Sequence, residues 1–281
     1  LPDLSHQDGR VNQFGFDGPQ MWHLMADDPT QDLVDRTIAV VEHQRPNRTR
    51  HNGRDDHRQD QQANHDLPTK IKKSADLMLC LFPFEVDFYR THQQKAIFVG
   101  HPLAEKLQPR KNHMPNKQVL LMPGSREAEI KTLLPELLSA AKLMRKKDPE
   151  IQFSLSLANE RLKDWVEDKI QGLDIVLSSG DAHEKIKNSD LVIVASGTAA
   201  LEVGLLAVPM VVVYKLSKVS YQIVKPLLNT KNVSLPNKIL GKDIVPELLQ
   251  NDVNGQNIFE QAMKLIESDN TKLVKELEKI H

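Results

Sequence analysis

The chain lacks several features that mark particular protein classes. It has one cysteine among 281 residues, Cys80, so it can form neither an internal disulfide nor a metal site built from cysteines. It has no apolar run of the roughly 18 to 20 residues that a membrane-spanning helix needs. The longest candidate, residues 203–214, is interrupted by Gly204 and Pro209. We therefore expect a globular protein of a reducing compartment, the cytoplasm, with no membrane span.

A large net charge of either sign is also missing. The 37 basic and 38 acidic residues nearly cancel, and 40% hydrophobic with 27% charged residues is typical of a soluble globular protein. Proteins that bind nucleic acid through its phosphates usually carry a basic excess. We therefore expect no nucleic-acid partner.

The first quarter of the chain differs in composition from the rest. No lysine occurs before Lys70, whereas seven of the twelve arginines lie within residues 1–66. Residues 44–66 contain a single apolar residue, Ala63, and such a segment cannot offset its ordering entropy. We predict that residues 1–66 are a disordered or non-native stretch, with a short helix or strand pattern only at 33–41. Interleaved aspartates and the lack of aromatic residues in 44–66 disfavour a nucleic-acid-binding tail.

From residue 75 onward, short apolar runs alternate with amphipathic stretches, which indicates an α/β fold around a parallel sheet. The predicted strands are residues 77–81, 96–99, 118–122, 152–157, 175–177, 191–195 and 210–214. Several are apolar on both faces, as in a sheet covered by helices on both sides. Apolar residues at three- and four-residue steps also predict one long helix with a buried stripe, made of Ile130, Leu133, Leu134, Leu137, Leu138, Ala141 and Met144.

The strongest chemical signal is a strand-to-helix turn within residues 120–130, LLMPGSREAEI. Gly124 lets the backbone approach a ligand, Ser125 can cap the helix, and the guanidinium of Arg126 is suited to phosphate. Together with the unpaired N–H groups at a helix start, these residues predict an anion site. A capped helix with a solvated arginine is the alternative interpretation, because serine is common at helix N-caps.

The residues after 191–195 repeat this layout. Ser196, Gly197 and Thr198 precede an apolar helix and can offer N–H groups and hydroxyls to a diphosphate. Glu202 lies inside that helix, where a carboxylate is unfavourable without a partner or access to water. Its two oxygens could accept hydrogen bonds from two ribose hydroxyls, although a position on an exposed helix edge would also explain it.

Two such turns after strands of one parallel sheet predict a nucleotide bound at the carboxyl ends of the strands. The chain has no Gly-x-x-x-x-Gly-Lys and no Gly-x-Gly-x-x-Gly motif, which disfavours ATP hydrolysis and dinucleotide redox chemistry and favours a nucleotide-sugar. His101, His113 and His183 show no metal-ligand spacing. We predict no metal, and a structural or solvent role for each histidine.

Five motifs follow one another in the order of a known family: residues 74–89 (SADLMLCLFPFEVDFY), 98–105 (FVGHPLAE), 120–130, 189–215 (SDLVIVASGTAALEVGLLAVPMVVVYK) and 233–250 (VSLPNKILGKDIVPELLQ). Over residues 70–265 the chain resembles lipid-A-disaccharide synthase. The resemblance implies a GT-B type glycosyltransferase with two Rossmann halves. It implies transfer of 2,3-diacylglucosamine from UDP-2,3-diacylglucosamine to 2,3-diacylglucosamine 1-phosphate, which forms a β-1,6 disaccharide and UDP in lipid A biosynthesis. It implies no metal and no cofactor.

The resemblance also implies roles for individual residues. Arg126 would contact the donor diphosphate and stabilise departing UDP, and Asn237 would line the cleft, so these two are the implied catalytic residues. The implied donor-binding set is Gly124, Ser125, Arg126, Ser196, Gly197, Thr198, Glu202 and Asn237. From the residues alone, Asn237 is more simply a turn residue after Pro236. The resemblance also implies a peripheral location on the cytoplasmic face of the inner membrane. It leaves open whether the protein forms a homodimer.

The chain departs from the family at its start. The family's N-terminal half has a glycine-rich beginning and an aspartate that acts as general base, and residues 1–66 show neither. We expect residues 67–107 to be the remnant of this acceptor half and residues 117–281 to be a complete nucleotide-sugar-binding Rossmann domain. The chain as given should then bind UDP without forming the disaccharide. An inactive UDP-binding fragment and another UDP-sugar enzyme of the same fold, such as a sugar epimerase, stay open as alternatives.

Overall fold

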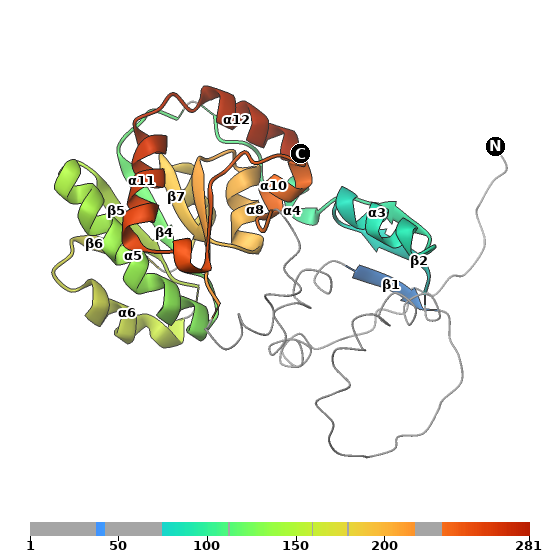
Figure 1. Ribbon diagram of the computed structural model, residues 1–281, viewed down its shortest axis with the longest axis horizontal. Coiled ribbons are helices and arrows are strands. Elements are labelled where there is room, and N and C mark those ends of the chain that lie inside the picture. The colour runs from blue at the N-terminus through green and yellow to red at the C-terminus, as the bar shows by residue number, and fades with distance from the viewer. Residues whose placement is uncertain (1–37, 43–74, 112, 159, 179, 217–231) are drawn as a thin grey trace, which may run out of the picture. The chain divides into compact units, whose positions relative to one another are not determined.

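The computed structural model describes residues 38–42, 75–111, 113–158, 160–178, 180–216 and 232–281, the first of these by its backbone only. Helices and strands alternate along the chain, as the apolar runs predict (Figure 1). The strands are β1 Ile38–Glu42, β2 Ala75–Cys80, β3 Ala96–Phe98, β4 Gln118–Met122, β5 Gln152–Ser156, β6 Ile175–Ser178, β7 Leu191–Ala195, β8 Met210–Tyr214 and β9 Glu247–Leu249. The α-helices are α3 Pro83–Thr91, α4 Pro102–Lys106, α5 Glu127–Lys147, α6 Lys163–Ile170, α7 Ala182–Lys187, α8 Thr198–Leu205, α10 Leu235–Leu240, α11 Gly255–Ile266 and α12 Thr271–Leu277.

The larger sheet has six parallel strands in the order β6-β5-β4-β7-β8-β9. Counted from β4, this is the doubly wound order 3-2-1-4-5-6. The chain first adds strands on one side of β4 and then returns to add them on the other side. The direction of winding therefore reverses between β4 and β7, and ligands of such sheets bind at this switch point, beyond the carboxyl ends of the strands.

Two apolar layers hold this sheet. On one face Val119 and Leu121 of β4 pack with the buried stripe of α5 and with α6 and α11, and on the other face Leu120 and Met122 pack with α8 and its neighbours. Figure 1 shows α5 and α11 on one side of the sheet and α8 on the other. All five residues of β7, LVIVA, are buried, because a central parallel strand is covered on both faces.

The smaller sheet has the order β1-β2-β3. Strand β1 pairs antiparallel to β2, whereas β2 and β3 are parallel and joined through α3. Met78, Cys80 and Tyr89 form its small buried cluster. Burial raises the pKa of the Cys80 thiol to about 11, with a smaller contribution from the nearby Glu85 carboxylate.

The α/β class with a Rossmann-type parallel sheet is confirmed, and the predicted strands 118–122, 191–195 and 210–214 agree with β4, β7 and β8 residue for residue. Strand β9 was not predicted, because three residues are too short to show a periodicity. Phe82 and Leu107 belong to the same buried cluster as residues of α8. The division into segments 67–107 and 117–281 stays a prediction. The predicted disorder of residues 1–66 falls outside the described residues, except for β1.

Candidate functional site

The two predicted anion turns lie side by side. Strands β4 and β7 are direct neighbours in the sheet, and Met122 at the end of β4 pairs with Val194 near the end of β7. Residues 123–126 and 196–198 therefore leave the same edge of the sheet next to each other, on the two sides of the switch point. Each leads directly into a helix, α5 after the first turn and α8 after the second.

The backbone of the first turn adopts the conformation that was expected from its glycine. Gly124 adopts φ +104°, in the region that favours glycine. Ser125 and Arg126 are exposed. The expectation that Ser125 caps the helix is wrong, because α5 takes Arg126 as its N-cap residue and has no side-chain cap.

Glu129, which sequence reasoning missed, reaches back to this turn. The backbone N–H of Ser125 donates a hydrogen bond of 3.2 Å to Glu129 Oε2. A Cβ added at Gly124 would lie 1.9 Å from the same oxygen, so the missing side chain of Gly124 makes room for the carboxylate. A carboxylate thus stands at the N-terminal end of α5, where negative charge is favourable. The Glu at the third position of the helix was a readable signal, because such residues commonly bond back to the chain before the helix.

The second turn is tied to the segment before α10. Ser196 Oγ donates to the carbonyl oxygen of Val233 over 3.4 Å, and Gly197 is the N-cap of α8 with φ +145°. A side chain at Gly197 would meet no heavy atom within 4 Å, so the backbone conformation rather than space favours glycine here. Thr198 begins α8 and is exposed. Of the three residues expected to contact phosphate, Ser196 and Gly197 are thus partly buried and Thr198 is exposed.

Glu202 is the single charged residue of α8, and the structure gives it a partner. Its Oε2 lies 3.1 Å from Nε2 of His183 on α7, with side-chain exposures of 23% for Glu202 and 40% for His183. The pair therefore sits at an open edge of the apolar layer. This contact was not predicted, because the sequence does not show that α7 packs against α8.

The two other histidines have structural roles, as expected. His101 caps α4 by accepting the N–H of Leu103 at Nδ1, and burial lowers its pKa. His113 lies 2.6 Å from Asp190, whose carboxylate also accepts the N–H groups of Asn116 and Gln118. Both contacts hold connecting segments onto the fold.

Asn237 is among the residues that line a hollow of about 540 Å³, together with Val245 and Glu247. It is 1% exposed, and its amide is used within the chain. Nδ2 donates to Val245 O and to Glu247 Oε1, and Oδ1 accepts the N–H groups of Ile244 and Val245. These four hydrogen bonds fill the ordinary capacity of a side-chain amide. The geometry therefore agrees with the simpler interpretation of Asn237 as a structural turn residue, and its place in the donor cleft stays a prediction.

Sequence reasoning did not identify Glu247, whose carboxylate holds the segment 233–237 in place. Its carboxylate accepts the N–H of Val233 at 2.7 Å, the N–H of Ser234 at 3.1 Å, the hydroxyl of Ser234 at 2.6 Å and the amide of Asn237 at 2.7 Å. Because Val233 also accepts from Ser196, the network fixes the segment that borders the second turn. Sequence reasoning could not find it, because Glu247 lies 13 residues from Ser234 and belongs to an unpredicted strand.

The comparison with known families decides where the chain belongs. A family model described as lipid-A-disaccharide synthetase matches residues 64–280. The chain belongs to this family. A lipid-A-disaccharide synthase of Acinetobacter baylyi is 39% identical over 225 residues, which cover 72% of this chain and 57% of that protein. One of Idiomarina loihiensis is 38% identical over 225 residues, which cover 75% of this chain and 59% of that protein. The chain thus spans less than two thirds of the length of these relatives.

Solved structures agree with the fold. The structure of a Listeria monocytogenes protein assigned as a UDP-N-acetylglucosamine 2-epimerase superposes with a TM-score of 0.51, over 74% of this chain and 55% of that chain, at 13% identity. This likeness supports the GT-B-like α/β architecture expected for the lipid-A-disaccharide synthetase family. Among the described residues, no helix is long and apolar enough to cross a membrane.

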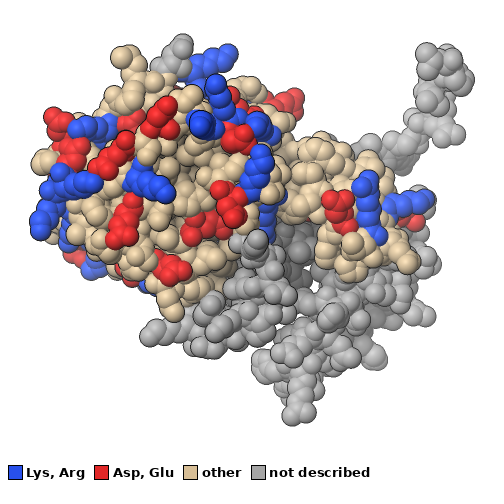
Figure 2. Space-filling model, turned by 45° about the horizontal axis from the view of Figure 1, so that its top comes forward, with Lys and Arg blue, Asp and Glu red and all other residues tan. Residues whose placement is uncertain are grey.

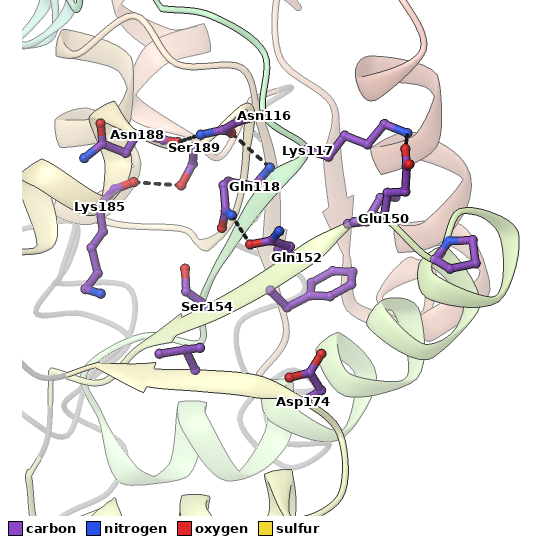
Figure 3. Close-up of a pocket in the computed structure, with 14 residues that line it drawn as sticks. Asn116, Lys117, Gln118, Glu150, Gln152, Ser154, Asp174, Lys185, Asn188 and Ser189 are labelled. Atoms are coloured by element: carbon purple, nitrogen blue, oxygen red, sulfur yellow. Dashed lines mark hydrogen bonds and ion pairs between the residues drawn. The ribbon is translucent and has the colours of Figure 1, made fainter.

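A polar hollow of about 1040 Å³ lies at the opposite edge of the sheet (Figure 3). It is lined by residues at the amino ends of β4, β5 and β6, among them Gln118, Gln152 and Asp174. Figure 3 shows the side chains of Gln118 and Gln152 paired with each other, at 2.5 Å, and Lys117 paired with Glu150, at 2.6 Å. Since these groups are engaged with one another and face away from the switch point, the hollow is not part of the candidate site.

The charges on the surface are mixed. On the face shown in Figure 2, lysine and arginine side chains alternate with aspartate and glutamate side chains over the larger sheet's domain. This matches the nearly neutral composition of the whole chain. Lysine and arginine side chains therefore form no broad basic patch on the face that Figure 2 shows.

Proposed function

We propose that this chain supplies the UDP-sugar half of a lipid-A-disaccharide synthase. The reaction transfers 2,3-diacylglucosamine from UDP-2,3-diacylglucosamine to 2,3-diacylglucosamine 1-phosphate. The 6-hydroxyl of the acceptor attacks C1 of the donor sugar, its proton passes to a base, and UDP leaves with the electron pair of the broken C–O bond. The observation that carries the proposal is the placement of two glycine-containing turns on either side of the switch point, in a chain of this family.

In this proposal the leaving diphosphate lies across both turns. Gly124, Ser125 and Arg126 receive it on one side, and Ser196, Gly197 and Thr198 on the other. The N-terminal ends of α5 and α8 both point their backbone N–H groups and positive dipole ends at the negative charge that develops on UDP. Arg126 adds a guanidinium that can bind two phosphate oxygens at once. Such fixed donors can support UDP departure in a mechanism that needs no metal, and metal independence stays a prediction.

Glu202 is proposed to hold the ribose. It lies one helical turn beyond Thr198, and 23% of its side chain is exposed. A carboxylate with two oxygens suits the two adjacent ribose hydroxyls. Asn237 acts in this proposal as a positioning residue. Its side-chain amide donates to Glu247, Glu247 accepts the N–H of Val233, and the carbonyl oxygen of Val233 accepts the hydroxyl of Ser196 in the second turn.

The substrates define the expected setting. Both carry acyl chains, so the enzyme has to take them from a membrane surface, and we propose a peripheral location on the cytoplasmic face of the inner membrane. No general base is identified among the described residues, and the acceptor site is not located.

Two measurements test the proposal on the purified chain. Calorimetry with UDP should show saturable binding at a single site, and incubation with both lipid substrates should show whether UDP is released. Binding with release supports the synthase, whereas binding without release supports the alternative of a UDP-binding chain that does not turn over. Conversion of a UDP-sugar without the lipid acceptor would support another UDP-sugar enzyme of this fold, and absence of UDP binding would overturn the proposal.

A further inference from the structure

Within the part of the chain that the structure describes, the pair formed by His183 and Glu202 is the one polar contact that joins α7 to a residue of the proposed donor site. It was not expected from sequence, and it brings a second side chain to the edge of that site. Both residues are partly exposed, at 40% for His183 and 23% for Glu202, so the pair borders solvent rather than being enclosed in the core.

The contact with a carboxylate implies which nitrogen of the ring carries the hydrogen. An ionised carboxylate only accepts hydrogen bonds, so Nε2 of His183 has to carry the hydrogen that it shares with Glu202 Oε2 at 3.1 Å. This contact holds one oxygen of Glu202 at a defined place. The second oxygen, and the remaining lone pair of the first, are left for other donors.

The helix that carries His183 is itself held firmly. Ile186 of α7 is fully buried in the apolar layer that contains Ala200 and Leu201 of α8. Residues three apart lie on the same face of a helix, so the packing of Ile186 turns His183 toward α8 as well. The donor to Glu202 is therefore mounted on an anchored element, with Asp181 capping the first turn of α7.

A comparison within the chain shows what is special about Glu202. The Glu247 carboxylate accepts four hydrogen bonds from its own chain. Among the described residues, the side chain of Glu202 has a single partner, His183. In Glu202 one carboxylate oxygen is held by the protein, and the other is available to accept hydrogen bonds. This is the arrangement expected of a group that the protein orients in advance for binding a ligand.

We propose that His183 is a positioning residue that orients the Glu202 carboxylate for the two ribose hydroxyls of a uridine nucleotide, and so sets the preference for ribose over deoxyribose. This inference rests on the proposed function, because it needs Glu202 to face the ribose. His183 acts through Glu202 and does not touch the reacting atoms. Without it, Glu202 would have to be ordered by the ligand, and the cost of ordering would appear as weaker binding.

The test is calorimetry of the full chain with two probes, UDP and 2′-deoxy-UDP. The unmodified chain should bind UDP more tightly than 2′-deoxy-UDP. His183→Ala should weaken UDP binding by about three- to ten-fold, the range given by the cost of immobilising one side chain, and should weaken 2′-deoxy-UDP binding less. The ratio of the two affinities should therefore fall. His183→Gln, which keeps an N–H donor of similar reach, should restore the ratio, whereas the shorter His183→Asn should not.

Two controls separate positioning from structure. Lys187→Ala removes an exposed ion pair with Glu184 on the same helix and should leave the affinity ratio unchanged. In a Glu202→Ala background, His183→Ala should have no further effect on the ratio, because the residue through which it acts is gone. The Asn and Gln variants carry the comparison if His183→Ala does not fold.

The outcomes are distinct. If the unmodified chain does not bind UDP, the proposed function fails and this inference fails with it. If the chain binds UDP but His183→Ala leaves the affinity ratio unchanged, or weakens both probes equally, the positioning role is overturned while the proposed function stands. A fall in melting temperature with an unchanged ratio also overturns it, because that is the result expected of a purely structural contact.

Discussion

Two neighbouring regions at the same edge of the sheet differ in the burial of their polar side chains. In the segment that runs from Val233 to Glu247, Ser234 and Asn237 are buried, and their polar groups and the Glu247 carboxylate are satisfied within the chain. At the two turns after β4 and β7, residues such as Ser125, Arg126 and Thr198 are exposed. We call the first region the brace and the second the anion edge. Polar residues that look alike in the sequence motifs therefore differ in burial, and we propose that the brace sets position while the anion edge binds the ligand.

This contrast has a measurable form. A substitution in the brace should lower stability, since it leaves buried donors and acceptors without partners. A substitution in the anion edge should lower affinity for UDP and leave stability nearly unchanged, because exposed groups contribute little to folding. The predictions below test this division, beginning with the largest expected effect.

Asn237→Ala should give the largest loss of stability. The change removes all four hydrogen bonds of a side chain that is 1% exposed, and should lower the free energy of unfolding by about 3 kcal/mol. The melting temperature should fall by roughly 6 to 12 °C. Asn251→Ala, at an exposed position, is the control and should change little. A stable Asn237→Ala variant with lost UDP affinity would move Asn237 from the brace to the anion edge.

Arg126→Ala should weaken UDP binding more than any other change at the anion edge. Charge-assisted hydrogen bonds contribute about 1.5 to 3 kcal/mol, so the affinity should fall by roughly ten- to a hundred-fold. Arg126→Lys should lose less, because it keeps the charge but cannot bind two phosphate oxygens with one planar group. Calorimetry with UDP measures both variants. Equal loss in the two, or no loss, would remove Arg126 from the diphosphate site.

Glu202→Gln should weaken UDP binding by about ten-fold, since an amide keeps one acceptor oxygen but loses the charge of the carboxylate. The melting temperature should stay near that of the unmodified chain, because the side chain is partly exposed and has one recorded partner among the described residues. Glu247→Gln is the matched change in the brace, and there the stability should fall instead. If Glu202→Gln lowers stability and keeps UDP affinity, Glu202 belongs to the brace.

Glu129→Gln should have the smallest effect, and in the opposite direction. Its carboxylate accepts the N–H of Ser125, a group that the donor phosphate is proposed to use, so the two anions compete. Removing the charge should strengthen UDP binding by about two- to three-fold, as expected when a contact of a few tenths of a kcal/mol is relieved. Glu127→Gln removes a charge from the same helical turn, where Glu127 pairs with Lys131, and measures the long-range effect alone. An equal gain in both variants would show that Glu129 does not compete locally.

Much of the fold can be predicted from the sequence because its signals are local and periodic. The strand LVIVA is apolar at every position, as a strand covered on both sides must be, and the buried stripe of α5 is visible in the spacing of its apolar residues. The turns were found for a similar reason, since glycine before serine, arginine or threonine at the start of a helix is a local pattern. Strand β9 and the Glu247 network depend on contacts between distant segments, so no local sequence pattern predicts them.

The sequence by itself determined the α/β class, the family, and the residue types that can hold a diphosphate at each turn. Only the tertiary structure decided that β4 and β7 are neighbours, which brings the two turns to one edge of the sheet. It also decided that His183 meets Glu202, that Glu129 reaches Ser125, and that Asn237 turns inward to Glu247. The physical reason is that propensity and capping act within a few residues, whereas strand order and side-chain pairing are settled by how the apolar layers pack.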